Sequence, residues 1–298
     1  MAYSFKPADE SVEAGLKRVA RSQIESGLED LRAEELPQEE KVHQIRKRCK
    51  KIRGLLRLVR PCFDGYKAEN ECFRDAARTL SEVRDASAVL ETVDEIENRF
   101  ADELKKAALK PLRTQLSADR DELDETEIEE KLADLRLVFR EALDRVEGWT
   151  LSADGAEAVS EGAAKTYKRA VKAMAKAESS GAAEDFHDWR KRAKYHWYHL
   201  RLVRKSWPPV LEPYADEAHH LSNLLGAHHD LHVLTEAAER QFGSRDETFE
   251  LVASLCGARQ NSLADEALPL GRKLFWADKN AFEDKLETLW QTSQSEPA

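Results

Sequence analysis

The sequence predicts an all-α protein, and three observations point to that fold class. Gly and Pro are scarce, at 12 and 9 of 298 residues, and charged residues make up 35% of the chain, a composition that favours helices over sheets. Apolar residues recur at helical spacing, and no segment alternates as a half-buried strand does. The length allows two core-bearing units or one large domain with internal symmetry.

Four helices are predicted in the first half of the chain. The first begins near Ser11, a residue type that caps helix starts, and Pro37 stops it after residue 36. A basic helix covers residues 39–59, and a third helix covers residues 69–100. Pro111 and the acidic run 119–130 separate the third helix from a fourth over residues 128–146.

The second half repeats this order after a join at residues 148–155. A helix over residues 155–178 precedes a break at Ser179-Ser180-Gly181, and a second basic helix ends at Trp207-Pro208-Pro209. The next helix runs from about Pro213 to beyond Arg240, and two more helical stretches surround Leu251 and Phe282.

The two basic helices are near copies of each other. Val42-His43-x-x-Arg46-Lys47-Arg48-x-Lys50 recurs 144 residues later as Phe186-His187-x-x-Arg190-Lys191-Arg192-x-Lys194. Residues 56–60 likewise match residues 200–204. An internal repeat implies two copies of one structural unit. We therefore expect one domain over residues 1–298, with repeat one at about 9–149 and repeat two at about 150–298.

Positive charge is concentrated in these two helices, which carry almost no acid beside it. Of the 47 Lys and Arg, nine lie in residues 41–60 and seven in residues 187–205, which leaves 31 basic against 56 acidic residues elsewhere. The whole chain has a formal net charge of −10. A general nucleic-acid binder is more often basic overall. The pattern instead favours a sheltered site for a polyanion.

Helical geometry places the cations of each copy on one stripe, next to an apolar stripe. In the first copy the apolar stripe is Ile45, Cys49, Ile52, Leu56 and Val59, and the basic stripe is Arg46, Lys50, Arg53, Arg57 and Arg60. In the second copy the apolar stripe is Trp189, Ala193, Leu200 and Val203, and the basic stripe is Arg190, Lys194, Arg201 and Arg204. The repeat therefore preserves faces as well as residue types.

Such stripes are unfavourable in isolation, because like charges one helical turn apart repel. The four pairs from Arg46 to Arg60 cost about 1–2 kcal/mol in total. Acids from neighbouring helices are one explanation, since salt-bridge networks commonly accompany basic helices. A bound polyanion is the other. It is favoured because the stripe occurs twice and both helices almost exclude acids.

A third segment repeats more loosely. Leu80-x-x-Val83-Arg84-Asp85 resembles Leu225-Gly226-x-His228-His229-Asp230, so Arg84 and His229 occupy matching positions. Arg74 and Arg78 lie one turn apart and extend the predicted site. Near the end of the chain, Arg272 and Lys279 form another basic cluster, predicted to share one helix face.

Several other chemistries have no support in the sequence. The histidines at 219, 220, 228, 229 and 232 raise a metal hypothesis, but no carboxylate or Cys stands at ligand spacing. The chain carries no phosphate-binding glycine loop, no dinucleotide fingerprint and no context for a Ser or Cys nucleophile. We expect no cofactor and no catalysis. Cys49 lies in an apolar stripe and is expected to be buried. No apolar run reaches membrane-spanning length, so we expect a cytoplasmic protein without a membrane partner.

These segments resemble the CHAD family, the conserved histidine α-helical domain. The similarity is most specific in residues 186–194 with Tyr198, in the Leu225-Gly226 to Leu231 segment, and in residues 271–275. It implies two four-helix bundles related by a pseudo-twofold axis, in the stand-alone form of the family. It also implies non-catalytic binding of inorganic polyphosphate in a central basic groove or pore, and an association with polyphosphate granules.

The candidate polyphosphate-binding residues are the cations of both repeats and the histidines beside them. They are His43, Arg46, Lys47, Lys50, Arg53, Arg57, Arg74, Arg78, Arg84, His187, Arg190, Lys191, Lys194, Arg201, His229, Arg272 and Lys279. We expect both His43 and His187 to become protonated beside a polyanion. Tyr195 and Trp197 replace Lys51 and Arg53 in the second copy, so one half of the site is less charged or packs through its aromatics.

Two other functions stay open at the level of sequence. One is a metal-dependent phosphohydrolase or phosphotransferase that uses the paired histidines, which would need a metal–carboxylate cluster or an activated nucleophile. The other is RNA binding, which the acidic remainder of the chain disfavours. The sequence leaves protein partners and the oligomeric state undetermined.

Overall fold

Helices make up the fold throughout the part of the chain that the structure describes. The structure, a computed structural model, describes residues 3–102, 108–121 and 125–295, without the side chains of residues 82 and 84–87. In the first half, the helices are α1 (Val12–Arg32), α2 (Gln38–Leu58), α3 (Tyr66–Arg78), α4 (Ser81–Arg99), α5 (Lys110–Asp121) and α6 (Glu125–Val146). In the second half, they are α7 (Gly155–Ser180), α8 (Ala183–Val203), a 3₁₀ turn (Arg204–Ser206), α9 (Pro208–Phe242), α10 (Glu247–Leu274) and α11 (Lys279–Ser295). No strand occurs among these residues, so the all-α prediction is confirmed.

Most predicted helix ends agree with the structure. The Ser11 hydroxyl accepts a hydrogen bond of 3.0 Å from the backbone N–H of Ala14, which caps α1. Gly181 ends α7 with φ at +65°, a conformation that glycine adopts without steric cost. The predicted helix start at Pro213 is late by five residues, because Pro208 opens α9 and Pro213 lies inside it.

Two predictions for residues 69–130 are wrong. The single helix expected over 69–100 is two helices, α3 and α4, which break at Thr79 and Leu80. Leu80 is fully buried there, so tertiary packing fixes a turn that no Gly or Pro marks. The segment expected to separate helices contains α5, and Pro111 fits in its first turn, where a proline N–H is not needed.

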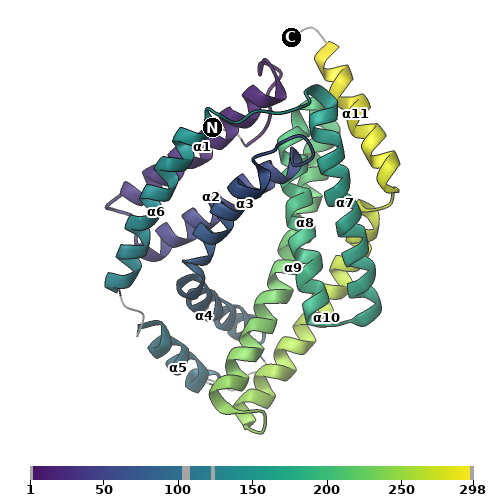
Figure 1. The fold of residues 1–298 in the computed structure, drawn as a ribbon. Helices are drawn as coiled ribbons and strands as arrows, with labels where there is room; N and C mark the ends of the chain where they lie inside the picture. Colours follow the sequence, from purple (N-terminus) through teal and green to yellow (C-terminus); the bar gives the residue numbers. More distant parts are fainter. Residues whose placement is uncertain (1–2, 103–107, 122–124, 296–298) are drawn as a thin grey trace.

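The helices pack in the same order in both halves. In the first half α1 contacts α2 and α6, and α2 contacts α3. In the second half α7 contacts α8 and α11, and α8 contacts α9. Between the halves, α2 contacts α8 and α4 contacts α9, while α2 also contacts α4. These contacts close a ring of helices, α2–α4–α9–α8, visible around the middle of the ribbon (Figure 1).

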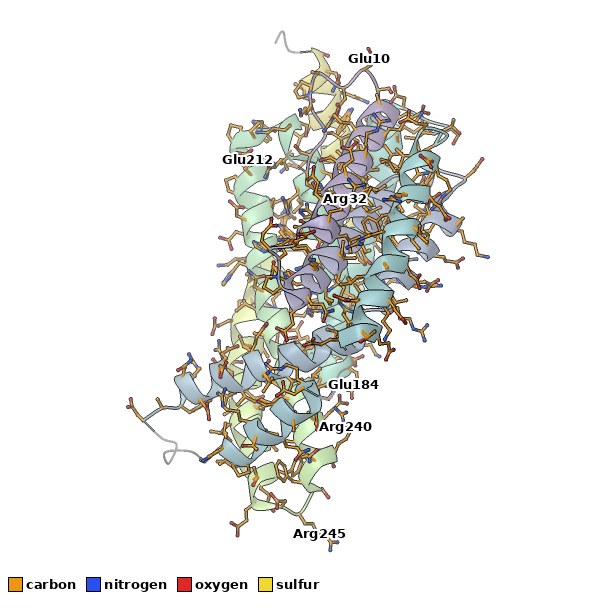
Figure 2. The ribbon with its side chains drawn as sticks, turned by 90° about the vertical axis from the view of Figure 1, so that its left-hand side faces the viewer. Glu10, Arg32, Glu184, Glu212, Arg240 and Arg245 are labelled. Carbon is orange, nitrogen blue, oxygen red and sulfur yellow. The ribbon has the colours of Figure 1, made fainter. Side chains whose placement is uncertain are left out.

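Two hydrophobic cores are present, and neither stops at the join between the halves. The first gathers residues of α1, α2, α3 and α6 but also takes Tyr198 and Leu202 from α8. The second gathers α8, α9 and α10 but also takes Val93 from α4 and Leu112 from α5. Each core therefore needs residues from both halves of the chain. The molecule is elongated, with Glu10 near one end and Arg245 near the other (Figure 2).

The apolar stripes of the basic helices are buried, as predicted. Ile45, Cys49, Ile52, Leu56 and Val59 have no exposed surface, and Trp189, Ala193, Leu200 and Val203 are at most 2% exposed. Burial also raises the pKa of the Cys49 thiol to about 12, which leaves it a small apolar side chain. These stripes turn the basic faces of α2 and α8 away from the cores.

Two glycines bring other helices close to α2. A Cβ atom at Gly162 of α7 would lie 1.7 Å from the backbone oxygen of Leu58, so only glycine permits this approach. A Cβ at Gly54 would lie 2.9 Å from the ring of Tyr198 on α8. The backbone of α2 is therefore the contact surface for both α7 and α8.

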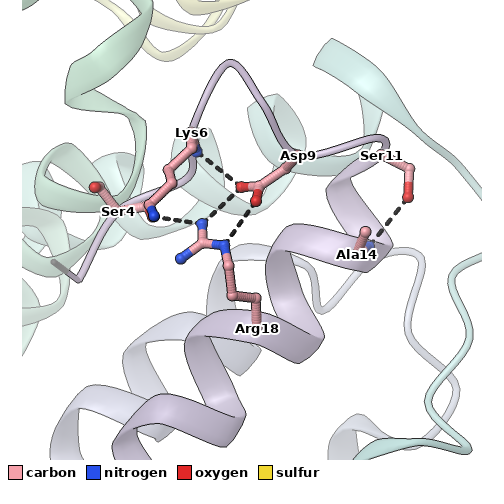
Figure 3. A network of polar contacts seen from close by, with 6 residues as sticks. All are labelled: Ser4, Lys6, Asp9, Ser11, Ala14 and Arg18. Atoms are coloured by element: carbon pink, nitrogen blue, oxygen red, sulfur yellow. Dashed lines mark hydrogen bonds and ion pairs between the residues drawn. The ribbon is translucent and has the colours of Figure 1, made fainter. Parts of the chain in front are cut away.

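Residues 3–10 form an N-terminal strap across α2 and α8. The Tyr3 hydroxyl donates a hydrogen bond of 2.6 Å to the carbonyl of Lys51, and the Phe5 N–H donates one of 2.8 Å to Leu202. Arg18 of α1 holds the strap by donating to both carboxylate oxygens of Asp9, at 2.6 Å each, and to the carbonyl of Ser4 (Figure 3). None of the described helices combines the length and apolar character that a membrane-spanning segment needs.

Candidate anion-binding site

Five cations gather where α2 passes α8. We call them the Lys194 cluster, and its members are Lys47, Lys51, Arg190, Lys194 and Arg201. Partial burial, followed by the charges of Arg190, Arg201 and Lys47, lowers the pKa of Lys194 to about 8. Because Lys47 and Lys51 come from α2 and Arg190, Lys194 and Arg201 come from α8, cations of the two repeats lie close to one another.

Lys51 of α2 also lies close to a cation of α8, Arg201. Burial is the main cause that lowers its pKa to about 8, followed by repulsion from Arg48, Arg201 and Lys47. The sequence placed Lys51 off the predicted basic stripe, so it was missed as a site residue. Its spacing from Lys47, one helical turn, was a signal that could have identified it.

Aromatic rings hold the cations of the cluster in place. The Lys194 ammonium lies 4.8 Å and the Arg201 guanidinium 5.1 Å from the ring centroid of Trp197. That indole stacks on His219, with 4.1 Å between ring centroids. On the other side, Arg201 lies 5.4 Å and Lys51 5.8 Å from the ring of Tyr3 in the N-terminal strap. Trp197 and Tyr3 thus flank Arg201.

Carboxylates are scarce around this cluster. Among the ion pairs of the described residues, none includes Lys47, Lys51, Arg190, Lys194 or Arg201. Three acids raise the pKa values of single members, Asp230 that of Lys194, Asp30 that of Lys51 and Asp216 that of Arg201, but in each case burial and the other causes outweigh the acid and the pKa is lowered. Direct salt bridges to these five cations are therefore absent from the part of the chain that the structure describes. A group of like charges that is not directly ion-paired favours the binding of an anion.

The predicted stripe of α2 turns toward α3 and toward the flank of α8. Arg46 donates a hydrogen bond of 2.9 Å to the carbonyl of Ala77, and Arg53 donates one of 3.3 Å to Asn70. The Arg57 guanidinium lies 4.4 Å from the ring centroid of Tyr195. Lys50 lies on the same face of α2. Because Tyr195 is about 100° round the helix from Lys194, each stripe meets the flank of the other basic helix rather than its stripe.

The histidines pair across two helices. The rings of His187 on α8 and His229 on α9 lie 3.8 Å apart between centroids. Burial, followed by nearby cations such as Lys191 and Arg190, lowers the pKa of His187 to about 4. Burial and His187 itself lower the pKa of His229 to about 3. Without an anion both rings are neutral, so the expected protonated form would have to be produced by the ligand.

Four other predicted residues are paired with acids. Arg74 bonds to Asp75 at 2.8 Å, Lys191 to Asp188 at 2.5 Å and Lys279 to Glu283 at 2.5 Å, and Arg272 bonds to Glu178. The prediction that Arg272 and Lys279 share a helix face is wrong, because α10 ends at Leu274 and Lys279 opens α11. These four cations lie at the surface and do not join the Lys194 cluster.

The remaining predicted residues lie around α3 and α4. His43 is exposed and lines a surface hollow with Val83 and Glu91 of α4. Arg78 is exposed at the end of α3. The side chain of Arg84 lies outside the described residues. Within the described chain, no three His, Cys, Asp or Glu side chains are placed to hold a metal ion.

Comparison with models of known protein families gives one result that decides the classification. The CHAD domain model matches residues 18–239, which is most of the chain and includes both basic helices. The chain belongs to the CHAD domain family. The N-terminal strap lies outside the matched residues, as do α10 and α11.

A solved structure gives the same fold. The crystal structure of the CHAD domain from the plant Ricinus communis superposes on this CHAD domain with a TM-score of 0.57. The two share 18% sequence identity, and the match covers 93% of this chain and 94% of the plant domain. A search of the curated proteins finds no match. At this identity, the likeness supports the fold alone.

Proposed function

We propose that this protein binds inorganic polyphosphate without chemical conversion, and that the Lys194 cluster is the centre of the binding site. One observation carries the proposal: five cations from the two basic helices lie together without an acidic partner among the described ion pairs. Membership of the CHAD family, which is associated with polyphosphate binding, supports this ligand.

The residue types in the cluster suit a linear phosphate polymer. Arg201 and Arg190 offer planar forks of donors that match two phosphate oxygens, and Lys194 and Lys51 act as compact charges. A polymer with no base or sugar needs only such contacts. A bound phosphate chain would also relieve the repulsion that lowers the pKa of both lysines.

The acidic remainder of the chain adds selectivity. Outside the two basic segments 31 Lys and Arg stand against 56 Asp and Glu, so the rest of the surface repels polyanions. A thin polymer fits between the helices that carry the cluster more readily than a structured nucleic acid. We further propose that this binding brings the protein to polyphosphate granules in the cytoplasm.

Isothermal titration calorimetry with a series of phosphates tests the proposal. Long-chain polyphosphate is expected to bind more tightly than tripolyphosphate, ATP or sulfate, with affinity that falls as salt rises because counterions are released. No phosphate should be released from the polymer in the presence of Mg²⁺ or Mn²⁺. Equal affinities for the polymer and for sulfate would contradict the proposal. Phosphate release would point to the phosphohydrolase, and tighter binding of RNA to nucleic-acid recognition.

Matched variants locate the site. The double substitution Lys194→Gln/Arg201→Gln should weaken binding of the polymer by about 100-fold, since each lost charged hydrogen bond contributes about 1.5 kcal/mol. The control Lys110→Gln/Arg240→Gln removes the same charges from exposed positions on α5 and α9. An equal loss of affinity in the two variants would mean that binding depends on net charge and not on the Lys194 cluster. In cells, the first variant but not the control should leave the granules.

A further inference from the structure

We propose a second phosphate-binding face, on the other side of the α2–α8 contact, made by Arg57, Arg60, Arg169 and Arg192. We call these residues the Arg57 cluster. The inference rests on the proposed function for its ligand class, but it names a separate site and two residues, Arg169 and Arg192, that are not among the candidate residues of the sequence analysis.

Three helices supply the four arginines. Arg57 comes from the last turn of α2, Arg60 follows directly after that helix, Arg192 lies on α8 and Arg169 on α7. The close approach of α7 to α2 explains how Arg169 reaches them. Gly162 touches the Leu58 carbonyl, and Arg169, seven residues later, lies on nearly the same side of α7.

The guanidinium groups are near enough to repel one another. Burial lowers the pKa of Arg169, and the charges of Arg60, Arg192 and Arg57 lower it further, in that order. Tyr66 acts in the opposite direction. Among the ion pairs of the described residues, none includes any of the four arginines. The charge of Arg192 contributes to the lowered pKa of Asp188, one turn earlier, but that carboxylate is bonded to Lys191 at 2.5 Å.

The residue of the first repeat that matches Arg192 does have an acidic partner, so the fold permits an ion pair at this position. Arg48 stands at the position of Arg192, and it bonds to Asp30 at 3.1 Å and to Gln23 at 3.4 Å. The second repeat has no such partner at Arg192. One repeat thus neutralises this arginine and the other leaves it available to an anion.

Two tyrosines complete the face. The Arg57 guanidinium lies 4.4 Å from the ring centroid of Tyr195, and that of Arg60 lies 5.7 Å from the ring of Tyr66. Ring stacking leaves the edge of a guanidinium, with its N–H donors, directed away from the ring. The buried Nε of Arg57 has no partner among the described atoms. These features suit a short condensed phosphate, whose oxygens accept bidentate hydrogen bonds.

Calorimetry with tripolyphosphate as the probe tests the second face. The wild-type protein should bind about two molecules per chain, one at each cluster, because the two faces lie on opposite flanks of the contact. Arg169→Gln/Arg192→Gln should reduce this to about one, with affinity for long polyphosphate lowered about tenfold or more. The control Arg240→Gln/Arg245→Gln removes two exposed arginines at the far end of the molecule (Figure 2).

The variants separate the two proposals. If Lys194→Gln/Arg201→Gln weakens polymer binding while Arg169→Gln/Arg192→Gln behaves as its control, the second face is overturned and the proposed function stands. If neither pair changes binding, both are overturned. Thermal unfolding of each variant checks that it is folded, and a folded Arg169→Gln/Arg192→Gln protein that keeps two tripolyphosphates contradicts the inference.

Discussion

Tyr195 lies under the guanidinium of Arg57, at 4.4 Å from ring centroid to Cζ. In the first repeat its position is taken by Lys51, and that lysine interacts with Arg201, the counterpart of Arg57. The same pair of positions therefore forms an attractive cation–π contact between Arg57 and Tyr195 and a repulsive contact between Arg201 and Lys51. Sequence divergence between the repeats therefore places an aromatic ring against Arg57 on one face of the α2–α8 contact and a like charge against Arg201 on the other.

Replacement of Tyr195 tests the cation–π contact with Arg57. Tyr195→Leu removes the ring, and a cation–π contact at a partly buried site contributes about 0.5–2 kcal/mol. We expect tripolyphosphate binding at the Arg57 cluster to weaken severalfold, because Arg57 loses its fixed orientation. Tyr195→Phe keeps the ring and should bind as wild type. If calorimetry gives the same tripolyphosphate affinity for Tyr195→Leu and Tyr195→Phe, the ring contact with Arg57 does not contribute to binding.

The repulsion around Lys51 and Lys194 predicts that the affinity for polyphosphate depends on pH. Lys194 and Lys51 have pKa values near 8 in the free protein, and a bound polyanion raises both. Binding therefore takes up protons, and affinity should fall as pH rises through 8 toward the higher pKa values of the complex. Calorimetry at pH 8 in two buffers of different ionisation enthalpy measures this uptake. The double variant Lys51→Arg/Lys194→Arg keeps the charge and should abolish it. If proton uptake on binding is undiminished in that variant, groups other than Lys51 and Lys194 take up the protons.

The N-terminal strap predicts a link between stability and the site. Asp9→Asn weakens a doubly hydrogen-bonded pair with Arg18 in which both side chains are largely buried. We expect a loss of about 1–3 kcal/mol in the free energy of unfolding. Tyr3 should also become mobile and loosen Lys51 and Arg201. Urea unfolding measures the first effect, with Asp64→Asn at an exposed position as the control. A variant as stable as that control would show that the strap is held by Phe5 and Tyr3 alone.

Much of the fold was predictable from sequence because the basic helices bury whole apolar stripes. Positions such as Ile45 and Trp189 follow helical spacing and are fully buried. The break between α3 and α4 was not predictable, since Leu80 turns there to fill a core that distant residues build. Local sequence contains no breaker at that point.

The candidate site was predictable only in part, for a similar reason. The repeat identified Lys194 and Arg201, but the helix that brings Arg169 to Arg57 does so through Gly162, a contact between residues far apart in sequence. Tyr3 joins the Lys194 cluster through a strap that no periodicity marks. Acidic partners were equally hidden, because the Glu178 that pairs with Arg272 lies 94 residues away.

Buried His196 predicts sensitivity to acid. It lies among Tyr167, Tyr214, Phe275 and Phe282, and neither ring nitrogen has a described partner. Burial lowers its pKa to about 3, against an unfolded value near 6.5. The unfolded state therefore binds the extra proton, and stability present above pH 6.5 is lost as pH falls toward 3.

His196→Phe removes that titration. Between pH 8 and pH 5, the variant should lose about 2 kcal/mol less unfolding free energy than wild type. The comparison across pH cancels any change in packing. The exposed His220→Phe serves as the control and should follow wild type. An unchanged pH dependence in His196→Phe would mean that other groups cause the acid sensitivity.

The contact of Gly162 with Leu58 gives the most direct test of how the helices are assembled. In Gly162→Ala the new methyl group would overlap the Leu58 carbonyl at 1.7 Å, and the obstacle is backbone, which cannot rotate away. We expect α7 to shift and the free energy of unfolding to fall by about 3 kcal/mol. Gly257→Ala is the matched control, because nothing lies within 4 Å of its added Cβ. In mid-helix that change should stabilise by about 1 kcal/mol. Opposite signs in urea unfolding would establish the contact, whereas a gain of stability in both variants would show that α7 does not touch α2 at this point.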